Sequence, residues 1–359
     1  MNEALAKGAR NLLQNCAGAT AGDRVLLVGE QGPGIFFDPR LCDDLAQACA
    51  ALGIESRIVL AIPGADANHF PSSVSEAMQA TDITIFFSRL GDQVRFLDSP
   101  GTGRKIMCYT LDRAHLESAF GCMDYHVMQR LHDHLLARIK QSTVYSIEAP
   151  NGTSLTAVVP NAIDSGQQAV TDFSLQLFPV MIFPPLHFHR LEGQLVLDHF
   201  LLSSSTRAYS DSVLRLTSPI KVTIEDSRMI AFDGDRQLIV RLRSQLERAA
   251  SITGGDPYRL NSWHTGINPH TFYHGNPNED LERWGTVAYG SPRYTHIHAA
   301  GNDPGDVSIQ LFDASIRFDN ETIWDNGRFI YLDSDEIRAL LSDAERQLLN
   351  SSIRLDIGI

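Results

Sequence analysis

The first third of the chain alternates short apolar runs with segments of helical periodicity. The apolar runs are bounded by glycine, proline or charged residues, which is typical of buried strands. They predict four strands, at residues 25–28, 56–64, 82–88 and 105–111. Helices are predicted between them, at residues 1–20, 41–53 and 72–82. Strands that alternate with helices predict a parallel sheet with crossover helices.

A glycine-rich turn follows the first predicted strand, with Gly29, Gly32 and Gly34. Its spacing differs from the G-x-G-x-x-G pattern of dinucleotide-binding loops, and the chain has no G-K-[ST] sequence there. We therefore expect a Rossmann-like scaffold that binds no cofactor.

An amphipathic helix is predicted at residues 124–140, with one apolar face. His132 and His134 are two positions apart, so they point in different directions on this helix, and we expect both at the surface. After this helix, the helical periodicity gives way to alternating, strand-like stretches. We therefore predict two domains, residues 1–138 and residues 139–359.

The second half is dominated by alternating, strand-like stretches. A hairpin is predicted around Pro150, Asn151 and Gly152. Further strands are predicted at residues 178–185, 193–202, 220–226, 227–234, 308–318 and 322–331. One helix is expected at residues 236–250, a loop-rich region at 252–306 and a helical tail at 333–349. The predicted fold is a Rossmann-like α/β domain followed by an α+β, mainly antiparallel domain.

The net charge and the cysteine content limit the binding partners and the cellular location that we expect. The 359 residues carry a formal net charge of −13, which argues against nucleic acid or an anionic membrane as the main partner. No basic segment followed by an apolar run opens the chain, and no apolar stretch is long enough to span a membrane. The five cysteines include no C-x-x-C pair and all lie within the first 122 residues, so we expect reduced thiols and a cytoplasmic protein.

Candidate chemistry lies in the second half, where most of the 13 histidines occur. His187 and His189 form one H-x-H pair, and His296 and His298 form another. Residues two apart on a strand face the same side, so each pair can present two imidazoles to one metal ion. His264 precedes a turn rich in glycine, asparagine and proline, where functional side chains concentrate.

A carboxylate completes the candidate set. Asp313 follows an apolar strand, where burial is costly unless the group is paired or bound to metal. Two or three imidazoles and one carboxylate are typical of a non-haem Fe(II) oxygenase, or of a Zn or Mn hydrolase. The chain contains neither H-E-x-x-H nor G-x-S-x-G.

The order of these motifs resembles the aminopeptidase T superfamily, and within it the 2,5-dihydroxypyridine 5,6-dioxygenases. The resemblance covers most of the chain. It depends on GDRVLLVGE, APNGTSLTAVV, FPPLHFHRLEGQLVLD, SWHTGINP, RWGTVAYG and LFDASIRFDNETIWDNGRF. It implies a metal enzyme that forms a homodimer through the second domain.

The resemblance also implies ligand positions. His187 stands where the peptidases have a metal-binding glutamate, and His264 matches the dioxygenase version of a second position. Asp313 matches the aspartate of a final H-x-D pair, whose histidine position is occupied by Leu311. His296 or His298 would then supply the missing nitrogen.

Three hypotheses follow. In the first, His264, His296 and Asp313 hold Fe(II), and the enzyme oxidises or opens a small hydroxylated N-heterocycle or aromatic acid. His187, His189, His298 and Arg317 would then have catalytic roles, with Arg293 or Arg317 neutralising a substrate carboxylate. The second is a Zn- or Mn-dependent hydrolase or amidase. The third is a metal-free biosynthetic enzyme or binding protein, which the leucine at position 311 motivates.

Overall fold

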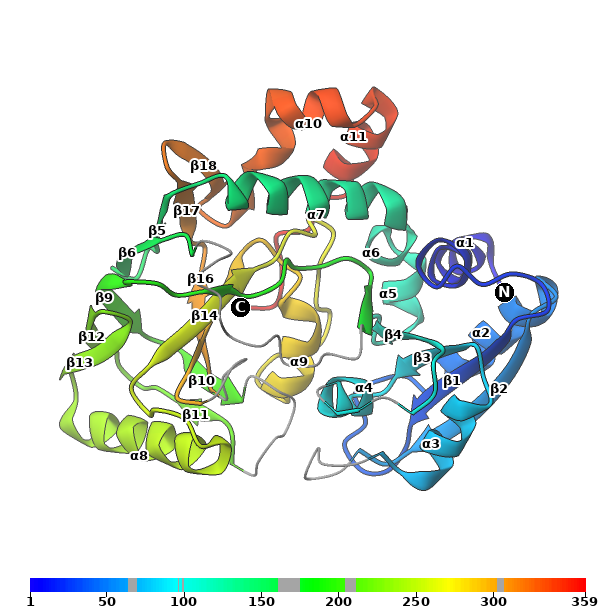
Figure 1. The fold of residues 1–359 in the computed structure, drawn as a ribbon, viewed down its shortest axis with the longest axis horizontal. Coiled ribbons are helices and arrows are strands. Elements are labelled where there is room, and N and C mark those ends of the chain that lie inside the picture. Colours follow the sequence, from blue (N-terminus) through cyan, green and yellow to red (C-terminus); the bar gives the residue numbers. More distant parts are fainter. Residues whose placement is uncertain (64–69, 96, 99, 161–174, 204–210, 302–306) are drawn as a thin grey trace.

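The computed structural model describes residues 1–63, 70–95, 97–98, 100–160, 175–203, 211–301 and 307–359. These residues form three sheets, one parallel and two antiparallel. The parallel sheet lies at one end of the molecule, and the antiparallel sheets lie at the other (Figure 1). The predicted combination of a parallel α/β part and an antiparallel part is therefore confirmed.

The parallel sheet has the strand order β2-β1-β3-β4-β7. Its strands are β1 (Arg24–Glu30), β2 (Glu55–Ala61), β3 (Ile83–Phe87), β4 (Arg104–Cys108) and β7 (Leu175–Phe178). The central strands β3 and β4 are buried almost throughout, as expected for a parallel sheet covered on both faces. The associated helices are α1 (Glu3–Arg10), a π-helix (Asn11–Cys16), α2 (Arg40–Ala51), α3 (Ser72–Gln79), α4 (Leu90–Val94), α5 (Arg113–Glu117) and α6 (Ala119–Cys122).

The edge strand β7 comes from the predicted second domain, residues 139–359. It pairs with β4 in parallel, after the chain has already formed the predicted hairpin β5 (Val144–Glu148) and β6 (Ser154–Val158). The boundary near residue 138 stays a prediction, but the chain crosses between the two parts more than once. The strand predicted at residues 178–185 is wrong, because after Phe178 this segment is a connection with one isolated bridge at Ile182.

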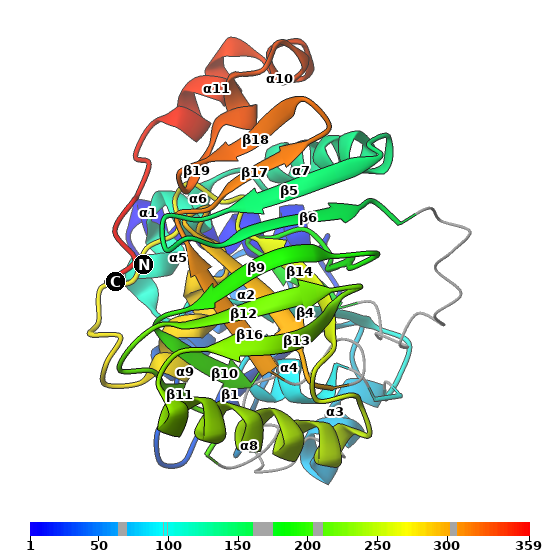
Figure 2. The same ribbon diagram turned by 90° about the vertical axis from the view of Figure 1, so that its left-hand side faces the viewer.

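The two antiparallel sheets pack face to face. One has the order β11-β10-β16-β15-β14-β8, and the other has the order β13-β12-β9-β6-β5-β17-β18-β19 (Figure 2). Trp263 of the first sheet packs against Tyr145 and Phe318 of the second, with ring centroids 5.4 and 6.3 Å away. These aromatic contacts form the core between the two layers.

The strands of these sheets have the following bounds. They are β8 (Leu186–His187), β9 (Glu192–Leu197), β10 (Phe200–Ser203), β11 (Leu214–Arg215), β12 (Ile220–Glu225), β13 (Arg228–Asp233), β14 (Leu260–Thr265), β15 (Tyr294–Ala299), β16 (Val307–Phe312), β17 (Ser315–Phe318), β18 (Glu321–Asp325) and β19 (Arg328–Phe329). The single unit predicted at 308–318 is thus two strands, which belong to different sheets.

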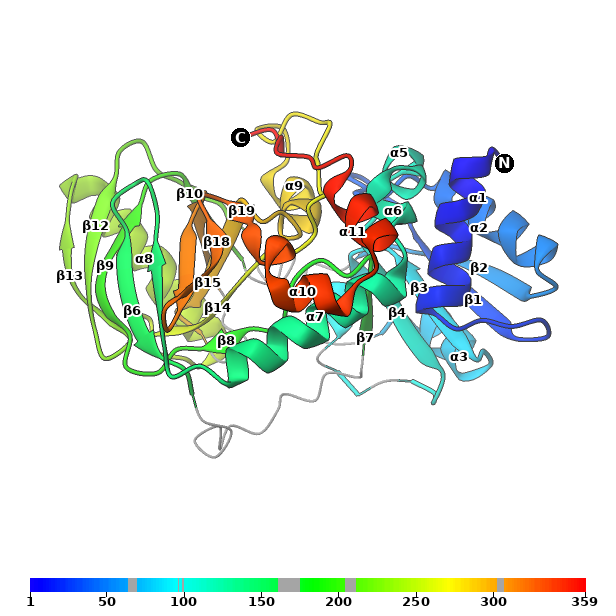
Figure 3. The same ribbon diagram turned by 90° about the horizontal axis from the view of Figure 1, so that it is seen from above.

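Helix α7 (Tyr125–Lys140) runs between the two parts, and α10 (Asp335–Leu340) and α11 (Asp343–Asn350) lie beside it (Figure 3). His134 of α7 contacts the Tyr331 hydroxyl in a short 3-10 helix (Ile330–Asp333) at 2.8 Å. Helix α8 (Arg236–Thr253) begins at the capping carboxylate of Asp235 and ends at Gly254, whose φ of 74° suits glycine. No helix in the described part of the chain is long and apolar enough to cross a membrane.

The region 252–306, which was predicted to be rich in loops, also contains helix and strand that the sequence analysis did not place. It contains β14, helix α9 (Leu281–Ala288) and β15. Both strands are central in their sheet and almost completely buried. The segments that connect these strands are rich in glycine and proline and resemble loop sequence. The strands themselves are stabilised by pairing with strands that are distant in the sequence.

Candidate metal centre

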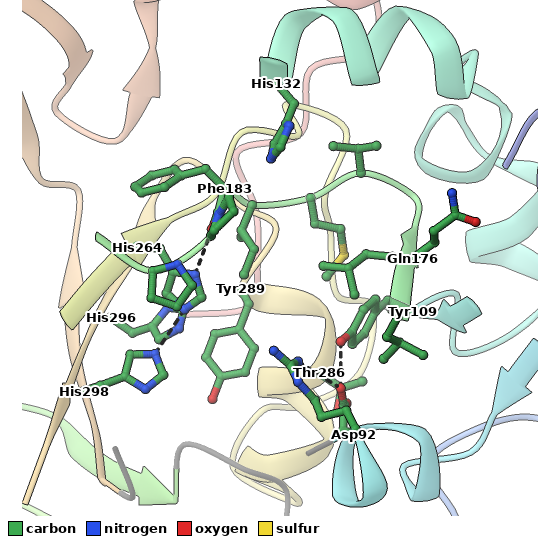
Figure 4. Close-up of a pocket in the computed structure, with 18 of the residues that line it drawn as sticks. Asp92, Tyr109, His132, Gln176, Phe183, His264, Thr286, Tyr289, His296 and His298 are labelled. Carbon is green, nitrogen blue, oxygen red and sulfur yellow. Dashed lines mark hydrogen bonds and ion pairs between the residues drawn. The ribbon is translucent and has the colours of Figure 1, made fainter. Parts of the chain in front are cut away.

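Strands β14 and β15 bring three histidines to one face of the six-stranded sheet. His264 lies directly opposite His296, and Ser262 lies opposite His298. The side chains between them, including Trp263 and Ile297, point to the other face and enter the core between the sheets. His264, His296 and His298 therefore converge on the side that faces the parallel sheet (Figure 4).

The three imidazoles are in close contact. One nitrogen of each lies within 4.8 Å of the others, and the Nε2 atoms of His264 and His298 are 3.1 Å apart. The ring of His296 lies 4.0 Å from that of His264 and 5.1 Å from that of His298, between centroids. All three residues are buried.

A backbone carbonyl fixes the tautomer of His264. Its Nδ1 donates to the carbonyl oxygen of Phe183 at 3.0 Å, in the connection that follows β7. In the neutral ring this leaves the lone pair on Nε2, which is turned toward His298. A carbonyl that holds the second nitrogen of the ring is a recurrent feature of metal-binding histidines.

Burial favours the uncharged form of two of the three rings, His264 and His296. Burial lowers the pKa of His264 to about 4, although the Phe183 carbonyl raises it, and the positive charge of Arg95 lowers it further. Burial also lowers the pKa of His296 well below its usual value, and the neighbouring His264 and His298 add to this effect. Neutral imidazoles offer the lone pairs that a metal ion requires.

The donor geometry fits a divalent ion. Two imidazole nitrogens bound to one zinc-like ion lie about 2.9–3.4 Å apart, given bonds of about 2.0–2.1 Å and angles of about 90–110°. The separation of 3.1 Å between His264 and His298 falls in that interval. Nδ1 of His296 is buried and has no hydrogen-bond partner among the described residues. His264, His296 and His298 could therefore hold one metal ion.

The cluster forms one wall of a cavity of about 450 Å³ between the two parts of the molecule. The Tyr289 ring lies 4.4 Å from the His296 ring, between centroids, and burial raises the pKa of Tyr289 to about 12. Across the cavity, Asp92 accepts a hydrogen bond of 2.7 Å from the Tyr109 hydroxyl (Figure 4). Arg95 forms an ion pair with the same carboxylate at 3.6 Å.

Sequence reasoning missed the polar wall opposite the histidines. Asp92 and Arg95 follow β3, and Tyr109 follows β4 directly. Ligands of open parallel sheets bind outside the carboxyl ends of the strands, and that rule was the signal that could have found these residues. His132, which was expected at the surface, instead lines the cavity from α7.

The other predicted site residues lie outside the cluster. His187 on β8 pairs with Ser262, so it shares the sheet face of the three histidines but not their group. The backbone carbonyl of His189 accepts a hydrogen bond from Val158, at 3.1 Å. Arg317 is exposed on β17, in the other antiparallel sheet. Among the described residues that line the cavity, none of these three appears.

Asp313 is not brought to the histidines either. Its two carboxylate oxygens accept hydrogen bonds from Arg293 at 2.7 and 2.9 Å, so both residues are occupied with each other. Asp313 has a φ of 52°, at the point where the chain leaves β16 for the other sheet. The carboxylate ligand expected from the sequence is instead part of an ion pair that stabilises this bend.

The register of the strands also explains why position 311 is a buried leucine and not a ligand. Leu311 pairs with Thr295, whereas His296 pairs with Gln310. Paired residues share a face, so Leu311 points away from the histidines and is completely buried. On the neighbouring strand, His296 and His298 have the same spacing as the expected H-x-D pair. His298 stands where that pair would have its aspartate.

The fold is similar to that of two solved structures. The chain is similar to the solved structure of 2,5-dihydroxypyridine dioxygenase from Pseudomonas putida KT2440, with a TM-score of 0.58 and 14% identity over 94% of this chain and 100% of that chain. It is also similar to wild-type AmpT from Thermus thermophilus, with a TM-score of 0.52 and 11% identity over 91% and 99%. These matches confirm the remote resemblance in fold. No protein family profile matches the sequence. No curated protein matches it either.

Proposed function

We propose that the chain is a mononuclear, metal-dependent enzyme that oxidises a small hydroxylated N-heterocycle or aromatic acid with O₂. The observation that carries this proposal is the group of three buried imidazoles at the wall of a cavity large enough for such a ring. The full-length likeness in fold to a 2,5-dihydroxypyridine dioxygenase supports the reaction class. The homodimer and the cytoplasmic location stay predictions.

His264, His296 and His298 would hold the metal, which supplies Lewis acidity and, as Fe(II), electrons for O₂. The side chains of the chain itself bind and orient the substrate. The cavity is largely apolar near Met181, Ile182 and Phe183, which suits the faces of a planar ring. Arg95 offers a positive charge to an ionised substrate oxygen.

Proton transfer would fall to groups at the cavity wall. His132 points into the cavity from α7 (Figure 4). Its Nδ1 lies 3.0 Å from the carboxylate of Asp133. That contact orients the ring and leaves Nε2 for a substrate hydroxyl. Tyr289 stays protonated at neutral pH because its pKa is raised, so it can donate a hydrogen bond but does not serve as a base.

A metal-dependent hydrolase is the second candidate, because one observation favours it. The group contains no carboxylate among the described residues, and three histidines with an open position are a known ligand set of catalytic zinc. Such a site lowers the pKa of a bound water for attack on an amide or ester.

Metal analysis combined with O₂ uptake separates these candidates. Purified protein should contain iron and should consume O₂ with dihydroxypyridines or hydroxylated aromatic acids. Zinc without O₂ uptake, together with anaerobic cleavage of amides or esters, would support the hydrolase instead. Full activity after chelation would contradict both and would favour a metal-free enzyme.

A further inference from the structure

A second group of metal-binding side chains lies outside the cavity. Asp112 precedes α5, His115 lies within α5, and His274 belongs to the connection between β14 and α9. One potential ligand atom of each lies within 4.8 Å of the others. Asp112 contacts His115 Nδ1 at 3.2 Å and His274 Nε2 at 2.9 Å, through its two different oxygens.

The hydrogen bonds of His115 point to a cation. Nε2 of its fully buried ring lies 3.0 Å from the carbonyl oxygen of Phe272, which can only accept, so Nε2 carries a proton. In the neutral ring Nδ1 then has a lone pair, and this lone pair faces the carboxylate of Asp112. Two acceptors repel each other unless a proton or a metal ion lies between them.

The carboxylate is oriented before any ion binds. Asp112 caps α5 by accepting the backbone N–H of His115 at 3.0 Å. Two arginines near this carboxylate are already paired, since Arg40 contacts Asp38 and Arg113 contacts Asp44. The ring of His274 is half exposed, with 46% of its side-chain surface accessible, so an ion can enter from solvent.

We propose that Asp112, His115 and His274 form a second divalent-metal site, of the zinc class. Two imidazoles and a carboxylate are a known set of zinc ligands, and the separations of 2.9 and 3.2 Å fit ligands of one ion, which are about 2.9–3.4 Å apart. Asp112 and His115 follow the parallel sheet, whereas His274 belongs to the antiparallel half. A bound ion therefore links the two parts of the molecule and stabilises their contact.

The test counts zinc bound to the full-length protein. Metal-free protein is dialysed against Zn²⁺, and bound zinc is measured by elemental analysis. His274→Ala is the main variant, because this ring is half exposed and its removal leaves the core intact. His126→Ala is the matched control, because His126 is an exposed histidine on α7. Asp112→Asn is the second variant, since asparagine still caps the helix but is a poor zinc ligand.

We expect His274→Ala and Asp112→Asn to lose one equivalent of zinc relative to His126→Ala, together with the increase in melting temperature that this ion produces. In a His264→Ala/His298→Ala background, which removes the cavity site, one equivalent should remain, and His274→Ala should abolish it. Equal zinc content in His274→Ala and His126→Ala would overturn the proposal. The group would then be a hydrogen-bond cluster that holds no metal ion.

Discussion

Strands β15 and β16 are neighbours that present the same residue spacing in different ways. β15 carries His296 and His298 on the face that lines the cavity. At the end of β16, Leu311 is buried on the opposite face, and Asp313 pairs with Arg293 at the bend. Two candidate ligands spaced by one residue form a site only when the register turns them toward a third ligand, which here is His264.

The largest effect is expected from removal of the third proposed ligand, His264. We expect His264→Ala to lower affinity for a divalent metal by more than about 100-fold, since even changes in residues that merely support a ligand cost about 10–100-fold. His187→Ala is the matched control, because His187 shares the sheet face but lies outside the group. Competition with a chromophoric chelator measures both affinities. Equal losses in the two variants would contradict the assignment.

The second prediction concerns pH. In the metal-free protein the pKa of His264 is lowered to about 4 from 6.5, so the unfolded chain takes up its proton first as the pH falls. The contribution of neutral His264 to the free energy of unfolding is fully present above pH 6.5. It falls by about 3 kcal/mol between pH 6.5 and 4.

Urea unfolding at pH 7 and pH 5 measures this effect. His264→Gln should reduce the difference between the two pH values, whereas Asp313→Asn should leave it almost unchanged. A His264→Gln protein with the full pH dependence would show that the acid sensitivity arises elsewhere.

The third prediction compares an arginine at the cavity with an arginine on the exposed face of β17. Arg95→Gln should raise KM about tenfold for a substrate that carries an ionised group, through the loss of about 1.4 kcal/mol of charge-assisted binding. A neutral analogue should be little affected. Arg317→Gln, on the exposed face of β17, is the control and should change neither value. If the two variants behave alike, Arg95 does not contact the substrate.

The smallest expected effect is at Asp313. Asp313→Asn removes the ion pair with Arg293, in which the two side chains are 32% and 23% exposed. Partly exposed pairs contribute about 1 kcal/mol or less, so the free energy of unfolding should fall by about that amount. Denaturant titration measures it. A loss of several kcal/mol would show that Asp313 has a larger structural role than its ion pair indicates.

The sequence was informative where local pattern determines structure. The apolar runs of β1, β3 and β4, the hairpin at Gly152 and the amphipathic α7 were predicted close to their observed positions. His264, His296 and His298 were predicted as site residues because of their spacing and context, and the structure brings all three together.

The errors have one physical origin, which is pairing between distant segments. β7 joins the parallel sheet next to β4, and β14 and β15 form in a region whose composition resembles loops. Nothing near Asp313 in the sequence indicates that Arg293 is opposite it, because strand register determines that contact. The polar wall with Asp92 and Arg95 depends in the same way on how the two parts of the molecule meet.

The most direct test of the central claim is the metal content of three proteins purified in parallel without added metal. All three carry His274→Ala, which removes a ligand of the proposed second site: one has this change alone, one adds His298→Ala and one adds Asp313→Asn. If the three histidines hold the ion, the protein with His274→Ala alone and the one with Asp313→Asn contain equal amounts of metal, and the one with His298→Ala contains almost none. Loss of metal in Asp313→Asn with retention in His298→Ala would contradict the account.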